Sequence, residues 1–311
     1  PRIDFSNDAK GALLLEPQRS NLITYSNDFS SSGYVTPNYG TSPEGLSVSR
    51  VLFTGTNQVF GGNTSLAIGV VCNFSAYVKG IKGELIRFAC GGQDISHTFS
   101  GEWERLSGSR TSINNSWNLN TFGGATARDF LLCGAQLEQG SYATSYIPTQ
   151  GGVVTRVKDL CVNTVPENIV NEDEMTLYCE FEYLGGGDTI PISVHNGGGS
   201  VIWLAVNLDF TIYGTNYYNS VFNGSSTSTT VLLPNTKYKV AYRTKSGNSA
   251  LYIDGILEAS SNDVISNPNT LNKVELGSFW NGANANPNLK IIDARCYNSG
   301  LSNAELQALT K

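Results

Sequence analysis

Strict alternation of side chains is the sequence feature that most restricts how this chain can fold. Over residues 175–183 every second position is apolar or a small thiol: Met175, Leu177, Cys179, Phe181 and Tyr183. Successive side chains of a strand point to opposite faces, so these five residues are predicted to share one buried face of a strand. Residues 72–78 repeat the pattern. Period two therefore predicts β-sheet as the main structure.

Length and turn residues extend this prediction to two domains. The chain has 311 residues with 33 Gly and 10 Pro, which favours many short strands and frequent turns. Domains average roughly 150 residues, and Pro148 with Gly151-Gly152 marks a junction. We predict an all-β protein of two tandem β-sandwich (jelly-roll) domains with one short C-terminal helix. The expected parts are an arm (1–18), a first sandwich (19–150), a linker (151–160) and a second sandwich (161–311).

Three local signals make this prediction more detailed. Asp254-Gly255 between two alternating runs predicts a tight hairpin over 251–257. Ser302 and Glu305 form a capping box, with Leu301 and Leu306 as its hydrophobic staple, so a brief helix is expected to pack on the second sandwich. The cluster 13–15, three leucines, either docks as an edge strand or packs against a neighbouring subunit, and docking is favoured.

Composition and charge exclude several functions. A net charge of −6 argues against a nucleic-acid surface, and no apolar run approaches the ~20 residues that span a bilayer, so no membrane insertion is expected. Six cysteines without a CxxC pair predict free thiols in a protein that folds in a reducing bacterial cytoplasm. The start at Pro1 is interpreted as a processed product or an excised fragment.

The inventory of reactive groups argues against catalysis. The two histidines, His97 and His195, fall in different halves of the chain. Glu180 and Glu182 are the nearest approach to a paired-carboxylate site, but a retaining glycosidase needs two carboxyls ~5 Å apart and these are expected to be solvated. We therefore predict that the protein is not an enzyme.

Aromatic residues among amides are the stronger signal, because a ring offers a flat apolar face to a sugar. Trp117 lies among four asparagines, and Trp280 is followed by a similar run beginning at Asn281. Trp103 and Trp203 are interpreted as core residues. The predicted carbohydrate-binding residues are Trp117, Trp280, Asn281, Tyr34, Tyr39, His195 and Tyr213.

The first half of the chain resembles a known family of modules. The opening run 12–29 and the closing segments 134–138, 146–149 and 155–156 are similar to the two ends of β-sandwich modules in bacteriophage tail and fibre proteins, in which the ends pair. Phe74 to Lys79, with Trp103 to Arg105, also resembles a carbohydrate-binding-module type of jelly roll.

The second half is similar to concanavalin-A-like, laminin-G-like jelly rolls. The resemblance lies in 251–255, 276–277, 292–298 and 301–306, with Cys296 as a mild departure. Members of both families often hold a structural calcium ion, so the resemblance implies calcium as a cofactor. The candidate ligands are Asp28, Asp129, Asp188 and Asp293.

Together these resemblances imply adhesion: a phage tail or fibre protein, located in the virion, that binds a bacterial surface glycan without chemistry. Contacts with other virion proteins and a homotrimer are implied in the same way. Two alternatives remain open. One is a purely structural virion decoration module, and the other is a non-catalytic appendage of a bacterial polysaccharide-degrading enzyme.

Overall fold

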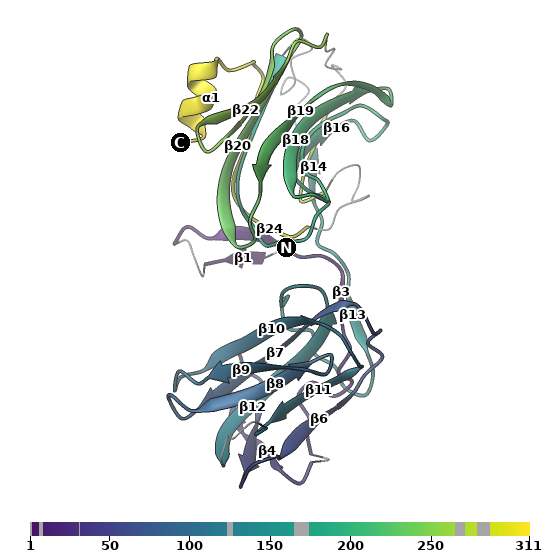
Figure 1. The fold of residues 1–311 in the computed structure, drawn as a ribbon. Helices are drawn as coiled ribbons and strands as arrows, with labels where there is room; N and C mark the ends of the chain where they lie inside the picture. Colours follow the sequence, from purple (N-terminus) through teal and green to yellow (C-terminus); the bar gives the residue numbers. More distant parts are fainter. Residues whose placement is uncertain are drawn as a thin grey trace. The chain divides into compact units, whose positions relative to one another are not determined.

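The computed structural model describes residues 2–5, 9–30, 32–122, 127–164, 174–264, 271–278 and 287–311. It divides into two compact units, shown in Figure 1: an N-terminal unit, Arg19–Val157, and a C-terminal unit built from Pro1–Gln18 together with Lys158–Lys311. Both units consist of antiparallel sheets, which confirms the predicted all-β class.

The N-terminal unit is a sandwich of two sheets with a short two-stranded ribbon. Its five-stranded sheet has the order β10(Glu104–Thr111), β7(Val71–Gly80), β12(Arg128–Gln139), β5(Ser47–Phe53) and β4(Val35–Thr41). Its four-stranded sheet has the order β6(Val59–Asn63), β11(Ser116–Asn120), β8(Leu85–Cys90) and β9(Gln93–Thr98). The ribbon pairs β13(Val154–Arg156) with β3(Arg19–Asn21).

Alternation explains the core of this unit. On β7 the predicted apolar face, Cys72, Phe74, Ala76 and Val78, is fully buried. These side chains meet residues of the second sheet, such as Ile86 and Phe88 of β8, in one continuous apolar cluster. Burying one face of each sheet against the other removes most of the apolar surface from water, which is the main stabilising contribution.

The two ends of the N-terminal unit pair with each other, as the resemblance implied. Val154, Thr155 and Arg156 lie opposite Asn21, Ser20 and Arg19. Tyr25 forms an isolated antiparallel bridge with Gln150, and the Leu22 N–H donates to the Leu137 carbonyl. Residues 154–156, expected in a linker, are therefore part of the N-terminal unit.

The C-terminal unit is a larger sandwich. One sheet has the order β1(Arg2–Asp4), β2(Ala12–Leu15), β24(Leu289–Tyr297), β15(Glu174–Tyr183), β20(Thr236–Lys245), β21(Ser249–Ile253) and β22(Ile256–Ser261). The facing sheet has the order β14(Cys161–Thr164), β23(Lys273–Leu276), β16(Thr189–His195), β17(Val201–Val206), β18(Thr211–Tyr218) and β19(Val221–Val231). The alternating face of 175–183 is buried between them.

The N-terminal arm is an integral part of this second sandwich. Leu13, Leu14 and Leu15 pair with Ile291, Lys290 and Leu289 of β24, so the favoured docking as a strand is observed. Leu15 is fully buried in the core of the C-terminal unit. Residues 1–18 therefore do not stand apart, and this unit is assembled from both ends of the chain.

The local turn and cap signals are confirmed. Asp254 and Gly255 have φ of 48° and 81°, the two positive values that a primed hairpin turn needs. Ser302 and Glu305 form the capping box of α1(Asn303–Leu309), and Leu306 is fully buried while Leu301 packs beside it. Among the described residues, no helix has the length and apolar character needed to cross a membrane.

Gly214 of β18 provides a test of packing between the two sheets of the C-terminal unit. A Cβ at this position would lie 2.2 Å from the ring of Tyr242, which is fully buried. We expect Gly214→Ala to lower the free energy of unfolding by about 2 kcal/mol, because a closely packed core cannot accept the extra group without displacement. Urea denaturation measures this. Gly198→Ala is the matched control, since its Cβ meets only Asn196 at 3.5 Å or more, and equal stability of both variants would contradict the prediction.

Candidate functional site

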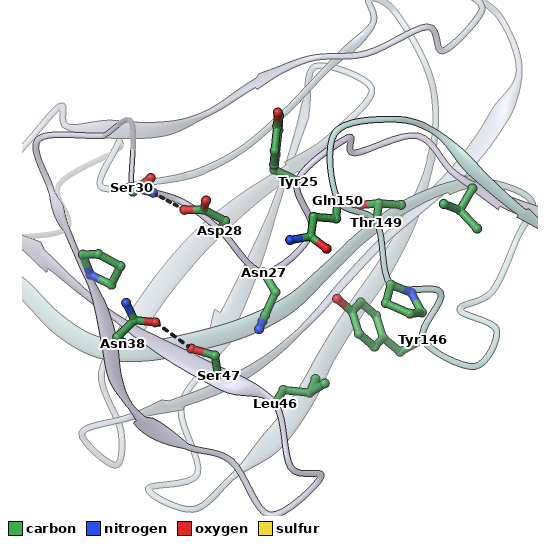
Figure 2. Close-up of a pocket in the computed structure, with 13 residues that line it drawn as sticks. Tyr25, Asn27, Asp28, Ser30, Asn38, Leu46, Ser47, Tyr146, Thr149 and Gln150 are labelled. Carbon is green, nitrogen blue, oxygen red and sulfur yellow. Dashed lines mark hydrogen bonds between the residues drawn. The ribbon is translucent and has the colours of Figure 1, made fainter.

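The candidate site is a pocket of about 830 Å³ in the N-terminal unit (Figure 2). Its walls come from four stretches that lie far apart in the sequence: residues 25–30, residues 37–38 of β4, residues 46–47 at the start of β5, and residues 146–154. Half of the Tyr25 side chain is exposed at its edge. The pocket is lined by Tyr25, Asn27, Asp28, Ser30, Pro37, Asn38, Leu46, Ser47, Tyr146, Pro148, Thr149, Gln150 and Val154.

Hydrogen bonds hold the opening segment against the closing segment beneath the pocket. Ser26 is fully buried, and its Oγ lies 2.6 Å from the Tyr146 hydroxyl and accepts from the Thr149 N–H at 2.9 Å. The Thr149 hydroxyl donates to the Ile23 carbonyl at 2.5 Å. Burial raises the pKa of Tyr146, so its hydroxyl stays protonated and can donate at neutral pH.

The polar groups around the pocket are fixed by local turns. The Asp28 carboxylate accepts from the Ser30 N–H at 3.0 Å, and its hydrogen bonds to Ser30 lower the pKa of Asp28, which is therefore ionised. The Asn27 side-chain oxygen accepts from the Gly134 N–H at 3.0 Å, which leaves its amide nitrogen toward the pocket. Asn38, with φ of 56°, accepts from the Ser47 hydroxyl at 3.2 Å.

Trp117 does not present its indole to solvent. It lies on β11, is 6% exposed and stacks on Phe74 with ring centroids 5.5 Å apart and an interplanar angle of 14°. Phe60 packs against its edge at 5.6 Å. The expected sugar platform is therefore a core residue, because the period-two register of β11 turns Trp117 and Leu119 into the core.

Neither Tyr34 nor Tyr39 lines the pocket, and the two side chains make different contacts. Tyr34 packs edge-on against Phe53 at 5.3 Å and supports the core. Tyr39 is 52% exposed and lies over the Arg50 guanidinium at 5.5 Å, beside a smaller hollow of about 290 Å³. Arg50 in turn donates two hydrogen bonds to Asp129, so this candidate calcium ligand is neutralised by an arginine.

His195 and Tyr213 lie in the C-terminal unit, on the face of the six-stranded sheet that points away from the main core. His195 is 1% exposed, its Nδ1 accepts from the Gly197 N–H at 3.0 Å, and its Nε2 lies 3.7 Å from Glu275. Burial lowers the pKa of His195 to about 4, so it is neutral at pH 7, and the side chain is too buried for the predicted contact with a carbohydrate. Tyr213 packs beside Trp203, which is buried as predicted.

The remaining predicted residues do not form a site that the structure describes. Trp280 and Asn281 lie outside the described residues. Asp293 forms an ion pair with Arg295. Asp188 lies directly before β16. Among the described residues, no group of three or more histidine, cysteine or acidic side chains is placed to hold a metal. Calcium binding stays a prediction.

Sequence reasoning missed most of the pocket residues, although one signal pointed to them. Tyr25 and Asn27 fall in the opening run 12–29, Tyr146 falls in the closing segment 146–149, and the resemblance implied that these segments pair. Gln150, which bridges to Tyr25, directly follows the closing segment. Following that pairing would have placed the aromatic and amide groups together. The two tryptophans in asparagine-rich stretches were the stronger sequence signal, because indole offers a large flat apolar face.

Comparisons with known proteins found similarity only among solved structures. No protein-family profile and no curated protein sequence matches the chain. The CBM40 module of the Ruminococcus gnavus IT-sialidase, bound to α2,3 sialyllactose, is similar at 15% identity over 45% of this chain and 84% of that one, with a TM-score of 0.38. Caenorhabditis elegans galectin LEC-6 is similar at 9% identity over 44% and 89%, with a TM-score of 0.33. The fold class stated above rests on the sheets of this chain and not on these similarities.

Proposed function

We propose that the N-terminal unit binds a glycan in the pocket beside Tyr25, without catalysis. The observation that carries the proposal is the combination in one pocket of a half-exposed aromatic ring, three side-chain amides and an ionised carboxylate. The C–H face of a sugar ring packs on an aromatic face, and its hydroxyls need both donors and acceptors. The volume of about 830 Å³ is within the range usual for ligand sites.

The charge of the pocket favours a neutral or amino sugar. Asp28 is its only ionisable carboxyl, and none of its described lining residues is Lys, Arg or His. An acidic saccharide would bring a second negative charge next to Asp28 with no cation to balance it, at a cost that grows where water is excluded. A hydroxyl or ammonium group, in contrast, can donate to the Asp28 oxygens.

The same count of carboxyls supports a binding role over a hydrolytic one. Glycoside hydrolysis uses a pair of carboxyl groups flanking the bond that breaks. The described residues that line this pocket include one carboxyl group, that of Asp28, and not a pair. We therefore propose a lectin-like role, and we propose that the protein is not an enzyme.

The biological setting proposed here is adhesion by a phage tail or fibre protein to a bacterial surface glycan. It is supported by the resemblance of both ends of the N-terminal unit to phage modules and by the pairing of those ends. In this setting the protein belongs to the virion and contacts other virion proteins. Assembly as a homotrimer would put three pockets in one particle, so that weak single-site binding becomes stronger by multivalency.

Binding of Tyr25→Ala to a glycan array is the direct test. The full chain is expected to bind one or more neutral or amino-sugar glycans, and the variant to bind them about 5- to 150-fold more weakly, because loss of an aromatic anchor costs about 1–3 kcal/mol. Tyr39→Ala is the matched control: Tyr39 is equally exposed but lies at the other hollow, and it should bind as wild type.

Asp28→Asn removes the negative charge of the pocket and keeps nearly the same side-chain shape. We expect weaker binding of amino sugars and unchanged or improved binding of acidic glycans. Thermal unfolding checks that both Tyr25→Ala and Asp28→Asn remain folded, as the exposure of these residues implies. If the chain binds no glycan, or if Tyr25→Ala binds as wild type, the proposed site is wrong, and the first of these results favours the structural decoration role.

A further inference from the structure

Two cysteines of the N-terminal unit meet across the interior of the sandwich. Cys72 is on β7 of the five-stranded sheet, and Cys90 is the last residue of β8 in the facing four-stranded sheet. Their sulfurs lie 2.8 Å apart, and both side chains are fully buried. All six cysteines carry free thiols in this structure, but this pair is already in sulfur–sulfur contact.

We propose that Cys72 and Cys90 form a disulfide that cross-links the two sheets when the protein folds in the presence of a small-molecule disulfide such as oxidised glutathione. One of the two cysteine thiolates attacks one glutathione sulfur, forming a mixed disulfide and releasing one glutathione thiolate. The other cysteine thiolate then attacks the cysteine sulfur of the mixed disulfide and releases the second glutathione thiolate. Two thiols lose two protons and two electrons, and one oxidised glutathione becomes two reduced molecules.

The surroundings favour this pair over other combinations. In the folded unit the hydrogen bond with Cys90 lowers the pKa of Cys72, in keeping with the close contact between the two sulfurs. Burial raises the pKa of Cys133, which lies on β12 of the same unit beside Ser42. Cys179 is fully buried in the other unit, where burial raises its pKa well above the usual value. The 2.8 Å contact between the Cys72 and Cys90 sulfurs is the observation that favours this pair.

The cross-link would close a loop of 18 residues that joins the two layers of the sandwich. A closed loop restricts the unfolded chain more than the folded one and so raises stability. For a unit of this size we expect the melting temperature of the N-terminal unit to rise by about 10 °C. The pocket beside Tyr25 belongs to the same unit, and its affinity for glycans should not change.

Refolding of the full chain from denaturant tests the proposal, because both sulfurs are buried and exchange needs an open chain. One sample refolds with reduced and oxidised glutathione, and the other with a phosphine reductant. Trypsin cleaves after Lys79, Lys82 and Arg87, which lie between the two cysteines, so Cys72 and Cys90 end up on separate peptides. Mass spectrometry without reduction is expected to find these two peptides joined in the oxidised sample, with the other four thiols alkylated.

The variants Cys72→Ser and Cys90→Ser should each lose the linked peptide and the rise in melting temperature, while Cys133→Ala should keep both. The peptide map of the wild-type chain decides the question even where a serine variant folds poorly. Six alkylated thiols after oxidative refolding, or a link made by any other pair, would overturn the proposal.

Discussion

Replacing Trp117 with alanine is expected to lower the free energy of unfolding of the N-terminal unit by about 3–5 kcal/mol. The indole is packed on three sides by Phe74, Phe60 and Phe29, with ring centroids 5.5, 5.6 and 6.4 Å away. Removing it deletes these contacts and leaves a cavity in a core that can collapse only partly. Urea denaturation followed by circular dichroism measures the loss.

Trp117→Phe is the control for this prediction. It keeps an aromatic ring in the same layer, so its loss of stability should be clearly smaller than that of the alanine variant. A Trp117→Ala variant that keeps its full stability and loses glycan binding would show instead that the indole is a surface platform.

Replacing Asn21 with alanine is expected to cost about 4 kcal/mol in the same unit. The side chain is fully buried; its Nδ2 donates to the carbonyls of Ala135 at 3.1 Å and Ile147 at 2.9 Å. Its Oδ1 accepts from the N–H groups of Ile23 at 3.1 Å and Leu137 at 3.2 Å. Each buried backbone group that loses its hydrogen-bond partner costs about 1–3 kcal/mol, and the alanine side chain has no donor or acceptor to replace the Asn21 amide.

Asn21 also joins the opening segment to the closing segment, so its loss should loosen the pocket as well as the fold. Chemical denaturation gives the change in stability, and glycan titration at a temperature where the variant is folded gives the change in affinity. Ser20→Ala is the matched control: the Ser20 hydroxyl meets only Thr155, in an exposed pair at 2.6 Å, and its removal should cost less than about 0.5 kcal/mol. An Asn21→Ala chain as stable as the Ser20→Ala chain would contradict the prediction.

The strands and turns were predictable because their signals are local. Alternation over 175–183 and 72–78, the Asp254-Gly255 turn and the Ser302–Glu305 capping box each depend on residues a few positions apart. The same alternation applied to residues 116–120 would have turned Trp117 inward. Its setting among asparagines was given more weight, and composition of a loop is a weaker guide to exposure than the register of a strand.

The amino-acid sequence by itself determined the all-β class, the division into two sandwiches and the capped C-terminal helix, since short-range periodicity and steric limits decide these. Only the tertiary structure decided that Arg2–Asp4 and Ala12–Leu15 complete the second sandwich, that Cys72 meets Cys90 and that Tyr25 meets Gln150. Each of these contacts joins positions distant in the chain, and which distant surfaces meet depends on how whole sheets bury their apolar faces together.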